Sequence, residues 1–340
     1  MESKFNIGII GAGRIGKLHA ENITFNVPQV KIKSIADVCM NDEMEKWAKQ
    51  LGISCVTKDA EEIINDKEIE AVLICSSTNT HAQFISECAQ AGKHIFCEKP
   101  IDFDLAKIKE ALEAVEKGGV KLQLGFVRRF DHNHKKVRDT VAKGLIGEPH
   151  IVKITSRDPE PPPIDYVRVS GGLFMDMMIH DFDMARYLSG SEVEEVFAMG
   201  DVLIEPAIGK EGDVDTAIVT MRFQNGALGV IDNSRKATYG YDQRTEVHGS
   251  KGCVFVLNDV PNTSVISTEE GVFCEKPPWF FLERYNDAFI TEIKEFFQAV
   301  INDTQTPVTG IDGLVSTQIA LAAKKSLKEK RPVRLSEITF

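Results

Sequence analysis

The feature that most restricts the fold of this chain is a glycine-rich turn near its N-terminus. The turn runs from Gly11 to Gly16 with the spacing G-x-G-x-x-G, between the apolar run 5–10 and the helix-like stretch 14–26. Gly11 permits the tight turn, Gly13 lets the backbone approach a phosphate, and Gly16 allows close packing of helix on strand. A strand, such a turn and a helix predict a βαβ unit that binds the pyrophosphate of a dinucleotide.

Apolar runs and amphipathic stretches alternate through the first third of the chain. The apolar runs are 5–10, 30–36, 71–75, 94–97 and 121–126, and the helix-like stretches are 14–26, 41–51, 80–91 and 104–118. Continuous apolar strands that alternate with helices are typical of a parallel sheet covered on both faces. Right-handed crossovers then give a doubly wound sheet. We therefore predict an α/β protein with a Rossmann domain over residues 1–124.

The pattern changes near residue 125, where consecutive strand-like segments replace the alternation. These segments are 194–204, 213–223, 226–234, 241–248 and 252–257, and helices are expected at 131–144, 173–188, 284–302 and 310–328. Consecutive strands with tight turns favour antiparallel pairing. We predict an α+β domain over residues 125–340 with a large, mostly antiparallel open sheet. The second face of that sheet needs a cover, which predicts a homo-oligomer packed sheet to sheet.

Composition restricts the partners and the compartment. The formal net charge of −11 argues against sequence-independent binding of nucleic acid and gives no attraction to anionic membranes. No apolar run is long enough to span a membrane, and the N-terminus has no signal-peptide pattern. The seven cysteines include no CxxC pair, and several lie in apolar runs. These features predict a cytoplasmic protein with reduced thiols.

An acidic residue follows the second apolar run at the distance expected for a ribose contact. Asp37 lies twenty-one residues after Gly16, close to the usual spacing of about 20. Its carboxylate would accept hydrogen bonds from the ribose hydroxyls and repel a 2′-phosphate, and the residues after it supply no arginine. The carboxylate of Asp37 and the absence of an arginine directly after it favour NAD over NADP. The alternative is an unliganded turn with Asp37 as a helix cap.

Two further groups of residues are candidates for chemistry. Lys99 follows the run 94–97, at the edge of the sheet where open α/β folds bind ligands. Asp176 and His180 are four residues apart in a strongly apolar stretch, so that one helix would present both on one face. A histidine held by a carboxylate is a general base. The alternatives are a solvated surface lysine, a satisfied core histidine and a zinc site, which lacks a supporting HExxH or cysteine cluster.

These motifs, together with residues 125–131, 171–183 and 239–244, resemble the family of glucose–fructose oxidoreductase and inositol dehydrogenase. The resemblance covers essentially the whole chain and is strongest to the inositol 2-dehydrogenases. It implies a homotetramer that uses NAD to oxidise one secondary hydroxyl of a cyclic polyol, with myo-inositol to 2-keto-myo-inositol as the expected reaction.

The resemblance also implies roles for individual residues. Lys99 would hydrogen-bond the reacting hydroxyl, His180 would be the general base, and Asp176 would orient substrate and histidine. The expected substrate contacts are Arg129, Asp158, Asp176, His180, Asp183, Tyr239 and Tyr241. The expected cofactor contacts are Gly11, Gly13, Arg14, Ile15, Gly16, Asp37, Ser76, Ser77, Asn79, His81, Glu98 and Lys99.

One departure bears on the substrate. Arg157 and Asp158 lie near the place where the inositol enzymes often carry histidine or asparagine, so the resemblance implies a change in which hydroxyls are read. The alternatives that stay open are a dehydrogenase for scyllo-inositol or another sugar, an NAD-dependent glycoside hydrolase, and a non-enzymatic sensor of NAD or sugar.

Overall fold

Residues 5–339 are described by the computed structural model, and they divide into two units. Unit 1 contains residues up to 127 together with residues 287–315, and unit 2 contains residues 128–286 and 316–339. The predicted boundary near residue 124 lies close to the first division. The prediction of one continuous second domain over 125–340 differs from this structure, because the chain returns to unit 1 near its end.

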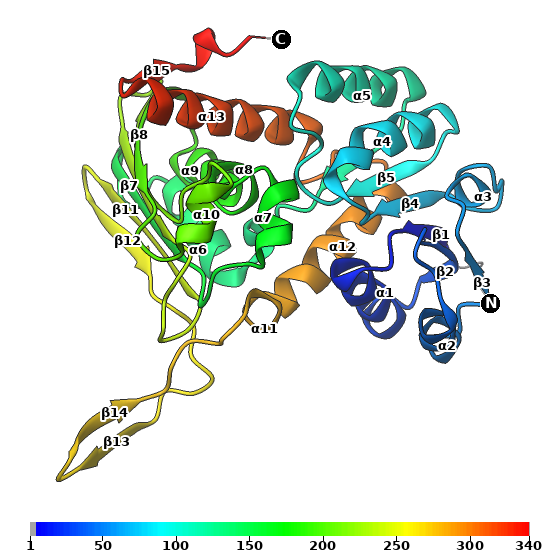
Figure 1. Cartoon of the computed structure of the whole chain (residues 1–340), viewed down its shortest axis with the longest axis horizontal. Helices are drawn as coiled ribbons and strands as arrows, with labels where there is room; N and C mark the ends of the chain where they lie inside the picture. The colour runs from blue at the N-terminus through cyan, green and yellow to red at the C-terminus, as the bar shows by residue number, and fades with distance from the viewer. Residues whose placement is uncertain (1–4, 340) are drawn as a thin grey trace. The chain divides into compact units, whose positions relative to one another are not determined.

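Unit 1 is built on a six-stranded parallel sheet (Figure 1). Its order is β3-β2-β1-β4-β5-β6, the classic order of a dinucleotide-binding sheet. The strands are β1 (Phe5–Ile10), β2 (Val30–Ala36), β3 (Cys55–Thr57), β4 (Ala71–Ile74), β5 (His94–Cys97) and β6 (Leu122–Leu124). The predicted Rossmann sheet is confirmed; the short strand β3 is an addition to it.

The helices of unit 1 begin and end at residues whose chemistry favours these positions. They are α1 (Arg14–Asn26), α2 (Asp42–Gln50), α3 (Glu61–Ile64), α4 (His81–Gln90) and α5 (Leu105–Gly118), with a 3-10 turn, η1 (Thr78–Thr80). Asn41 caps α2 by accepting from the Met44 N–H, and Asp104 caps α5 by accepting from the Ala106 N–H. The helix α5 ends at Gly119 in the left-handed conformation, φ 62°.

The return segment adds helix α12 (Asn286–Ile301) to unit 1. Ile293, Phe296 and Phe297 of this helix are fully buried in the same core as the strands of the sheet. The Phe297 ring meets Phe5 edge to face at 5.8 Å between centroids. Each buried aromatic contributes about 2 to 3 kcal/mol by leaving water, so the sheet holds this helix although it is far along the sequence.

Unit 2 is built on a seven-stranded sheet in the order β12-β11-β7-β10-β9-β8-β15. The strands are β7 (Pro149–Arg157), β8 (Val193–Asp201), β9 (Thr216–Phe223), β10 (Leu228–Ser234), β11 (Asp242–Gly249), β12 (Gly252–Val256) and β15 (Val333–Arg334). The central pair β7 and β10 is parallel, and all other neighbours are antiparallel. The predicted mostly antiparallel sheet is confirmed, with β7 and β15 as unpredicted members.

The two faces of this sheet differ. In β9 the residues Ala217, Val219, Met221 and Phe223 are buried, whereas the residues between them are exposed. Helices cover the buried face of the sheet (Figure 1). The helices of unit 2 are α6 (His132–Ala142), α7 (Ile164–Ser170), α8 (Leu173–Asp176), α9 (Ile179–Ser189), α10 (Pro206–Lys210), α11 (Phe281–Arg284) and the second half of α13 (Gly310–Glu329), with the 3-10 turns η2 (Val127–Phe130) and η3 (Leu335–Glu337).

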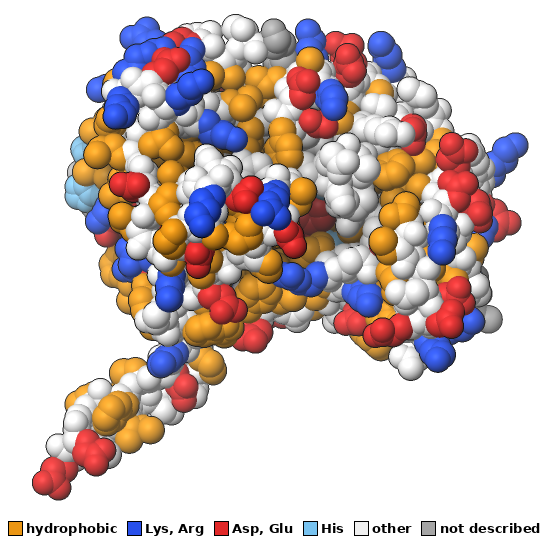
Figure 2. Space-filling model, viewed as in Figure 1, with side chains coloured by type: hydrophobic (Ala, Val, Ile, Leu, Met, Phe, Trp, Pro, Cys, Tyr) orange, Lys and Arg blue, Asp and Glu red, His pale blue; other side chains and the backbone are white. Residues whose placement is uncertain are grey.

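A two-stranded hairpin projects from unit 2 (Figure 1). It consists of β13 (Val265–Thr268) and β14 (Gly271–Cys274). Its apolar side chains Val265, Ile266, Val272 and Phe273 are exposed, and hydrophobic groups line the hairpin in Figure 2. An isolated two-stranded hairpin is marginally stable in water, so this arm has apolar surface available for a partner.

Among the described residues, none of the helices has the length and apolar character needed to cross a membrane.

Candidate active site

The residues predicted to act on cofactor and substrate divide between the two units. The predicted cofactor contacts and Lys99 belong to unit 1, whereas the other predicted substrate contacts, with Asp176 and His180, belong to unit 2. Each set has its own geometry.

The phosphate loop of unit 1 has the shape that a dinucleotide requires. Gly11 has φ +99°, and a Cβ atom there would lie 2.5 Å from the backbone of Cys75. A Cβ atom on Gly16 would lie 1.9 Å from the Gly11 carbonyl oxygen. A Cβ atom on Gly13 would meet nothing within 4 Å, so the backbone faces open space at the start of α1. The free N–H groups of a helix start can hold phosphate in that space, and the loop therefore fits a dinucleotide.

Asp37 braces this loop directly. Its Oδ2 accepts from the Ala12 N–H at 2.7 Å, and its Oδ1 accepts from the Cys39 N–H at 2.8 Å. Each carboxylate oxygen keeps a further lone pair, which ribose hydroxyls can use. The next residue, Val38, is exposed and uncharged. The arrangement fits NAD, whose ribose has a free 2′-hydroxyl.

The loop after β4 is tied to the loop after β5 by His81. Its Nδ1 lies 2.7 Å from the Pro100 carbonyl oxygen, and its Nε2 lies 3.0 Å from the Ser76 carbonyl oxygen. Burial lowers the pKa of His81. Because both ring nitrogens face carbonyl groups of the protein, the side chain positions the two loops. Ser77 and Asn79 are exposed on the first of them, and their contact with the cofactor stays a prediction.

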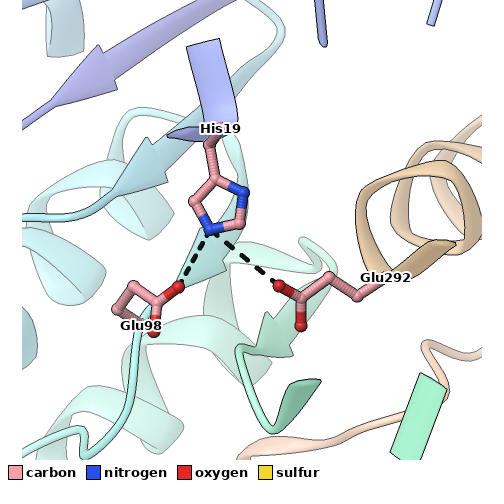
Figure 3. Close-up of side chains that lie close together, drawn as sticks. All are labelled: His19, Glu98 and Glu292. Carbon is pink, nitrogen blue, oxygen red and sulfur yellow. Dashed lines mark hydrogen bonds and ion pairs between the residues drawn. The ribbon is translucent and has the colours of Figure 1, made fainter. Parts of the chain in front are cut away.

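Glu98, directly before Lys99, belongs to a buried cluster that the sequence did not indicate (Figure 3). The His19 Nε2 atom lies 2.9 Å from Glu98 Oε1 and 3.9 Å from Glu292 Oε1. His19 and Glu292 are fully buried. Within residues 5–339 neither carboxylate oxygen of Glu292 has a hydrogen-bond partner. The cluster holds the Glu98 side chain inside unit 1 and so anchors the segment that carries Lys99.

Burial affects the ionisation of Glu292 in this cluster. Burial, and then the charge of Glu98, raises the pKa of Glu292 well above its ordinary value. One nitrogen and two carboxyl groups within 4.8 Å of one another could coordinate a cation. A metal ligand must be deprotonated, however, and burial favours the neutral acid at Glu292. The cluster therefore fits a proton-holding role better than a metal site.

In unit 2, Asp176 and His180 lie on different helices, which corrects the expectation of a shared helix face. The helix α8 ends at Asp176, and α9 begins at Ile179. The Met178 N–H bonds back to Leu173, five residues earlier, so the regular ladder is interrupted at residues 177–178. Both side chains are half-buried. The interruption redirects the chain between the two groups, so their four-residue spacing does not fix their geometry.

Asp176 is held on both oxygens by neighbours within unit 2. The Tyr166 hydroxyl donates to Oδ1 at 2.8 Å, and Arg235 Nη2 donates to Oδ2 at 3.0 Å. The same guanidinium donates through Nη1 to Asp158 Oδ2 at 3.0 Å. Two predicted substrate contacts, Asp158 and Asp176, are thus brought together by one arginine. Sequence reasoning missed Arg235, although it directly follows the predicted strand 226–234.

Arg129 and Asp183 form a bidentate pair. Arg129 Nε donates to Asp183 Oδ2 at 2.8 Å, and Nη2 donates to Oδ1 at 2.6 Å. Asp183 is buried, whereas Arg129 keeps some exposure and lies over the ring of Tyr187. Such fork-to-fork pairs fix orientation as well as charge. The geometry gives Asp183 the role of holding Arg129.

The predicted tyrosines differ in their surroundings. Tyr241 is buried, accepts from Arg128 Nη2 at 3.5 Å and packs edge to face on Tyr285. Tyr239 is exposed, and its hydroxyl donates to Asp242 at 2.5 Å. Arg128, which bonds to Tyr241, also forms a buried ion pair with Asp181. Tyr241 therefore belongs to the support of the site, and the substrate contact predicted for it stays a prediction.

Comparisons with known proteins cover both units. Residues 5–126 match an oxidoreductase family described by its NAD-binding Rossmann fold, and residues 134–255 match the GFO/IDH/MocA C-terminal domain. The oxidoreductase YrbE of Bacillus subtilis, described as uncharacterized, is 53% identical, with 98% of each chain covered. The myo-inositol 2-dehydrogenase of Thermotoga maritima is 52% identical over 98% of this chain and 99% of that protein. A solved scyllo-inositol dehydrogenase from Lactobacillus casei, with bound NAD(H) and scyllo-inositol, has a TM-score of 0.91 and 31% identity, covering 98% of this chain and 99% of that one.

Proposed function

Since the chain belongs to the GFO/IDH/MocA family of NAD-binding oxidoreductases, we propose that it oxidises myo-inositol to 2-keto-myo-inositol. The observation that carries the proposal is the 52% identity to a myo-inositol 2-dehydrogenase, which extends through the Rossmann unit and the unit that bears Asp176 and His180. A dinucleotide loop and a set of polar side chains suited to a polyol both accompany that identity.

The proposed chemistry assigns separate tasks to Lys99, His180 and Asp176. His180 takes the hydroxyl proton while the carbon–oxygen double bond forms. Lys99 donates a hydrogen bond to the same oxygen as negative charge develops on it. NAD, when bound, supplies the acceptor for the hydride that leaves the carbon. Asp176 orients substrate and histidine.

Recognition of a cyclic polyol requires several fixed donors and acceptors. Arg129, held by Asp183, supplies N–H donors, and Asp158 and Asp176 supply acceptor oxygens. A polyol isomer that lacks one matching hydroxyl leaves a polar group of the site unpaired, which discriminates strongly between isomers. The proposal therefore includes selectivity among inositols.

Scyllo-inositol is a second candidate substrate. It is favoured by the 31% identical L. casei enzyme that holds this isomer. Oxidation of either isomer gives the same ketone, 2-keto-myo-inositol, which no other sugar yields. We therefore expect NMR of the reaction mixture to show this ketone if either inositol is the substrate. Glucose oxidation without inositol turnover would refute both.

A cytoplasmic homotetramer is the proposed state of the enzyme. The outer face of the unit 2 sheet presents the neighbouring apolar side chains Met199 and Ile218, and the neighbouring pair Ile151 and Leu228. Uncovered apolar pairs on a sheet are typical of an interface. The cysteines in apolar strands suit a reducing compartment.

A further inference from the structure

Arg235 occupies a special position in the fold of unit 2. Strands β7 and β10 are parallel neighbours, and their last pair is Arg157 with Ser234. Asp158 and Arg235 are the next residue on each strand, so both lie at the carboxyl edge of the one parallel pair in this sheet. The Asp158 N–H donates to the Ser234 carbonyl at 3.0 Å, which extends the pairing to this edge. The paired backbone therefore fixes the positions of the Cα atoms of Asp158 and Arg235.

The guanidinium of Arg235 is buried and shared between two carboxylates. Its side chain is 4% exposed, and it donates to Asp158 and to Asp176 at 3.0 Å each. Burial opposes its charge, but the charges of Asp176 and Asp158 outweigh this and raise the pKa of Arg235. Burial raises the pKa of Asp158, and Arg235 acts against that rise. Arg235 thus opposes the effect of burial on Asp158 and holds the two acids close together.

The carboxylate of Asp176 gains a fixed orientation from this contact. Arg235 binds one of its oxygens, and the Tyr166 hydroxyl binds the other. Two donors on two oxygens determine the plane of the carboxylate and the direction of its remaining lone pairs. Arg235 itself has almost no exposed surface, so it acts on a substrate only through the two aspartates.

We propose that Arg235 is the positioning residue that sets isomer selectivity, because it holds Asp158 and Asp176 as one rigid pair of hydroxyl acceptors. The inference rests on the proposed function, since it names how the same site reads a cyclic polyol. Without the arginine the two carboxylates repel each other and lose their common orientation. The enzyme then no longer prefers the inositol isomer whose hydroxyl groups match the rigid pair of carboxylates.

A matched control exists in the same unit. Arg284 is equally buried, 3% exposed, and also bridges two carboxylates, Asp131 and Asp259. Neither partner belongs to the candidate site. A substitution at Arg284 therefore measures what a buried bridging arginine contributes to stability alone.

The test compares Arg235→Met, Arg235→Lys and Arg284→Lys with the wild type. For each protein, kcat and KM are measured with myo-inositol, scyllo-inositol and D-chiro-inositol, together with Tm and the NADH affinity by fluorescence. We expect Arg235→Met to lower kcat/KM for the preferred isomer about 100-fold and to change the ratio between isomers at least about tenfold. NADH affinity should stay within about twofold. Arg235→Lys, which keeps the charge but not the fork, should give a smaller change in the same direction.

Two results would overturn the inference. One is an unchanged isomer ratio in both Arg235 variants, which would leave only a structural role. The other is the same change of ratio in Arg284→Lys. If Arg235→Met does not fold, Arg235→Lys decides by the same ratio.

Calorimetric titration of each inositol into the enzyme–NADH complex measures binding without turnover, so it tests the role of Arg235 independently of the proposed reaction. A wild type that binds an inositol but oxidises none contradicts only the proposed reaction, and the binding ratios in the variants then test Arg235. A wild type that neither binds nor oxidises any of the three contradicts both.

Discussion

Lys99 and His180 contribute different parts of the proposed chemistry, and neither belongs to the phosphate loop. We expect Lys99→Ala and His180→Ala each to lower kcat about 10³-fold, the usual effect of removing a general base or a donor to the developing charge. NADH affinity should be unchanged in His180→Ala and should fall only a few-fold in Lys99→Ala, because Lys99 is also an expected cofactor contact while the phosphate loop and Asp37 stay in place. Steady-state kinetics and fluorescence titration check both quantities.

The control for these variants is His150→Ala, which removes an exposed histidine of β7 and should keep full activity. Near-normal turnover in either Lys99→Ala or His180→Ala would contradict the assigned roles.

Glu292 predicts a pH dependence of stability. Its pKa is ordinarily 4.5 and is raised in the folded protein by burial and by Glu98. Above pH 4.5 the unfolded chain loses this proton while the folded chain keeps it, so the free energy of unfolding falls as pH rises. Glu292→Gln cannot ionise and lacks this loss. We therefore expect the Tm of Glu292→Gln minus that of the wild type to increase steadily from pH 5 to pH 8.

Exposed Gln298 on the same helix, α12, supplies the control, since Gln298→Ala changes no ionisable group and should give a Tm difference that does not vary with pH. A difference independent of pH for Glu292→Gln as well would show that Glu292 ionises normally in the folded protein.

The residues that sequence reasoning found and missed differ in where their partners lie. Lys99 and Asp37 could be predicted because each follows an apolar strand, and the ends of parallel strands meet at one edge. His19 and Glu98 are 79 residues apart, and Arg235 and Asp176 are 59 residues apart. Such pairs depend on how elements pack, which no local pattern encodes.

At the scale of the element, substitutions in the phosphate loop can change NADH affinity and stability independently. We expect Gly13→Ala to keep the wild-type Tm within about 1 °C, because its Cβ meets no protein atom and the φ of −71° suits alanine. The added methyl group occupies the space where the phosphates approach, so NADH affinity should fall at least about tenfold. Differential scanning fluorimetry and NADH fluorescence measure the two effects.

Gly16→Ala is the paired variant. Its Cβ would lie 1.9 Å from the Gly11 carbonyl oxygen, so the turn itself must shift. We expect a clear loss of Tm, which corresponds to a loss of about 1 to 3 kcal/mol in the free energy of unfolding, the usual effect of overpacking a core site. Equal Tm values for the two variants would contradict the geometry of the loop.

Helices and strands were predicted well where the spacing of apolar residues is regular, and less well where it is not. The five main strands of unit 1 and their helices lie within a few residues of the predicted ranges. The strand β7 was missed because it stands alone between two helices, α6 and α7, and its partners β10 and β11 come more than 70 residues later in the chain. The stretch 173–188 was predicted as one helix and forms α8 and α9, because the interruption at residues 177–178 leaves the apolar pattern unchanged. The return of α12 to unit 1 could not be predicted, because an amphipathic pattern indicates a helix but not the sheet on which the helix packs.

For the whole molecule, the outer face of the unit 2 sheet predicts assembly. We expect light scattering to give a mass four times that of the 37.8 kDa chain. The double variant Met199→Lys/Ile218→Lys places charges on neighbouring strands of that face and should yield smaller species, because buried unpaired charge is costly.

Leu145→Lys alters an equally exposed apolar residue outside the sheet and should leave the mass unchanged. A wild-type mass equal to one chain would contradict assembly through this face.

Absorbance at the NADH band shows directly whether the protein oxidises an inositol with NAD. The protein is mixed with NAD and, in turn, with myo-inositol, scyllo-inositol, D-chiro-inositol and glucose, and the series is repeated with NADP. We expect rapid NADH formation with myo-inositol and NAD, and little reduction of NADP because of Asp37. No NADH with any inositol, from a protein that binds NAD, would contradict the proposed oxidation.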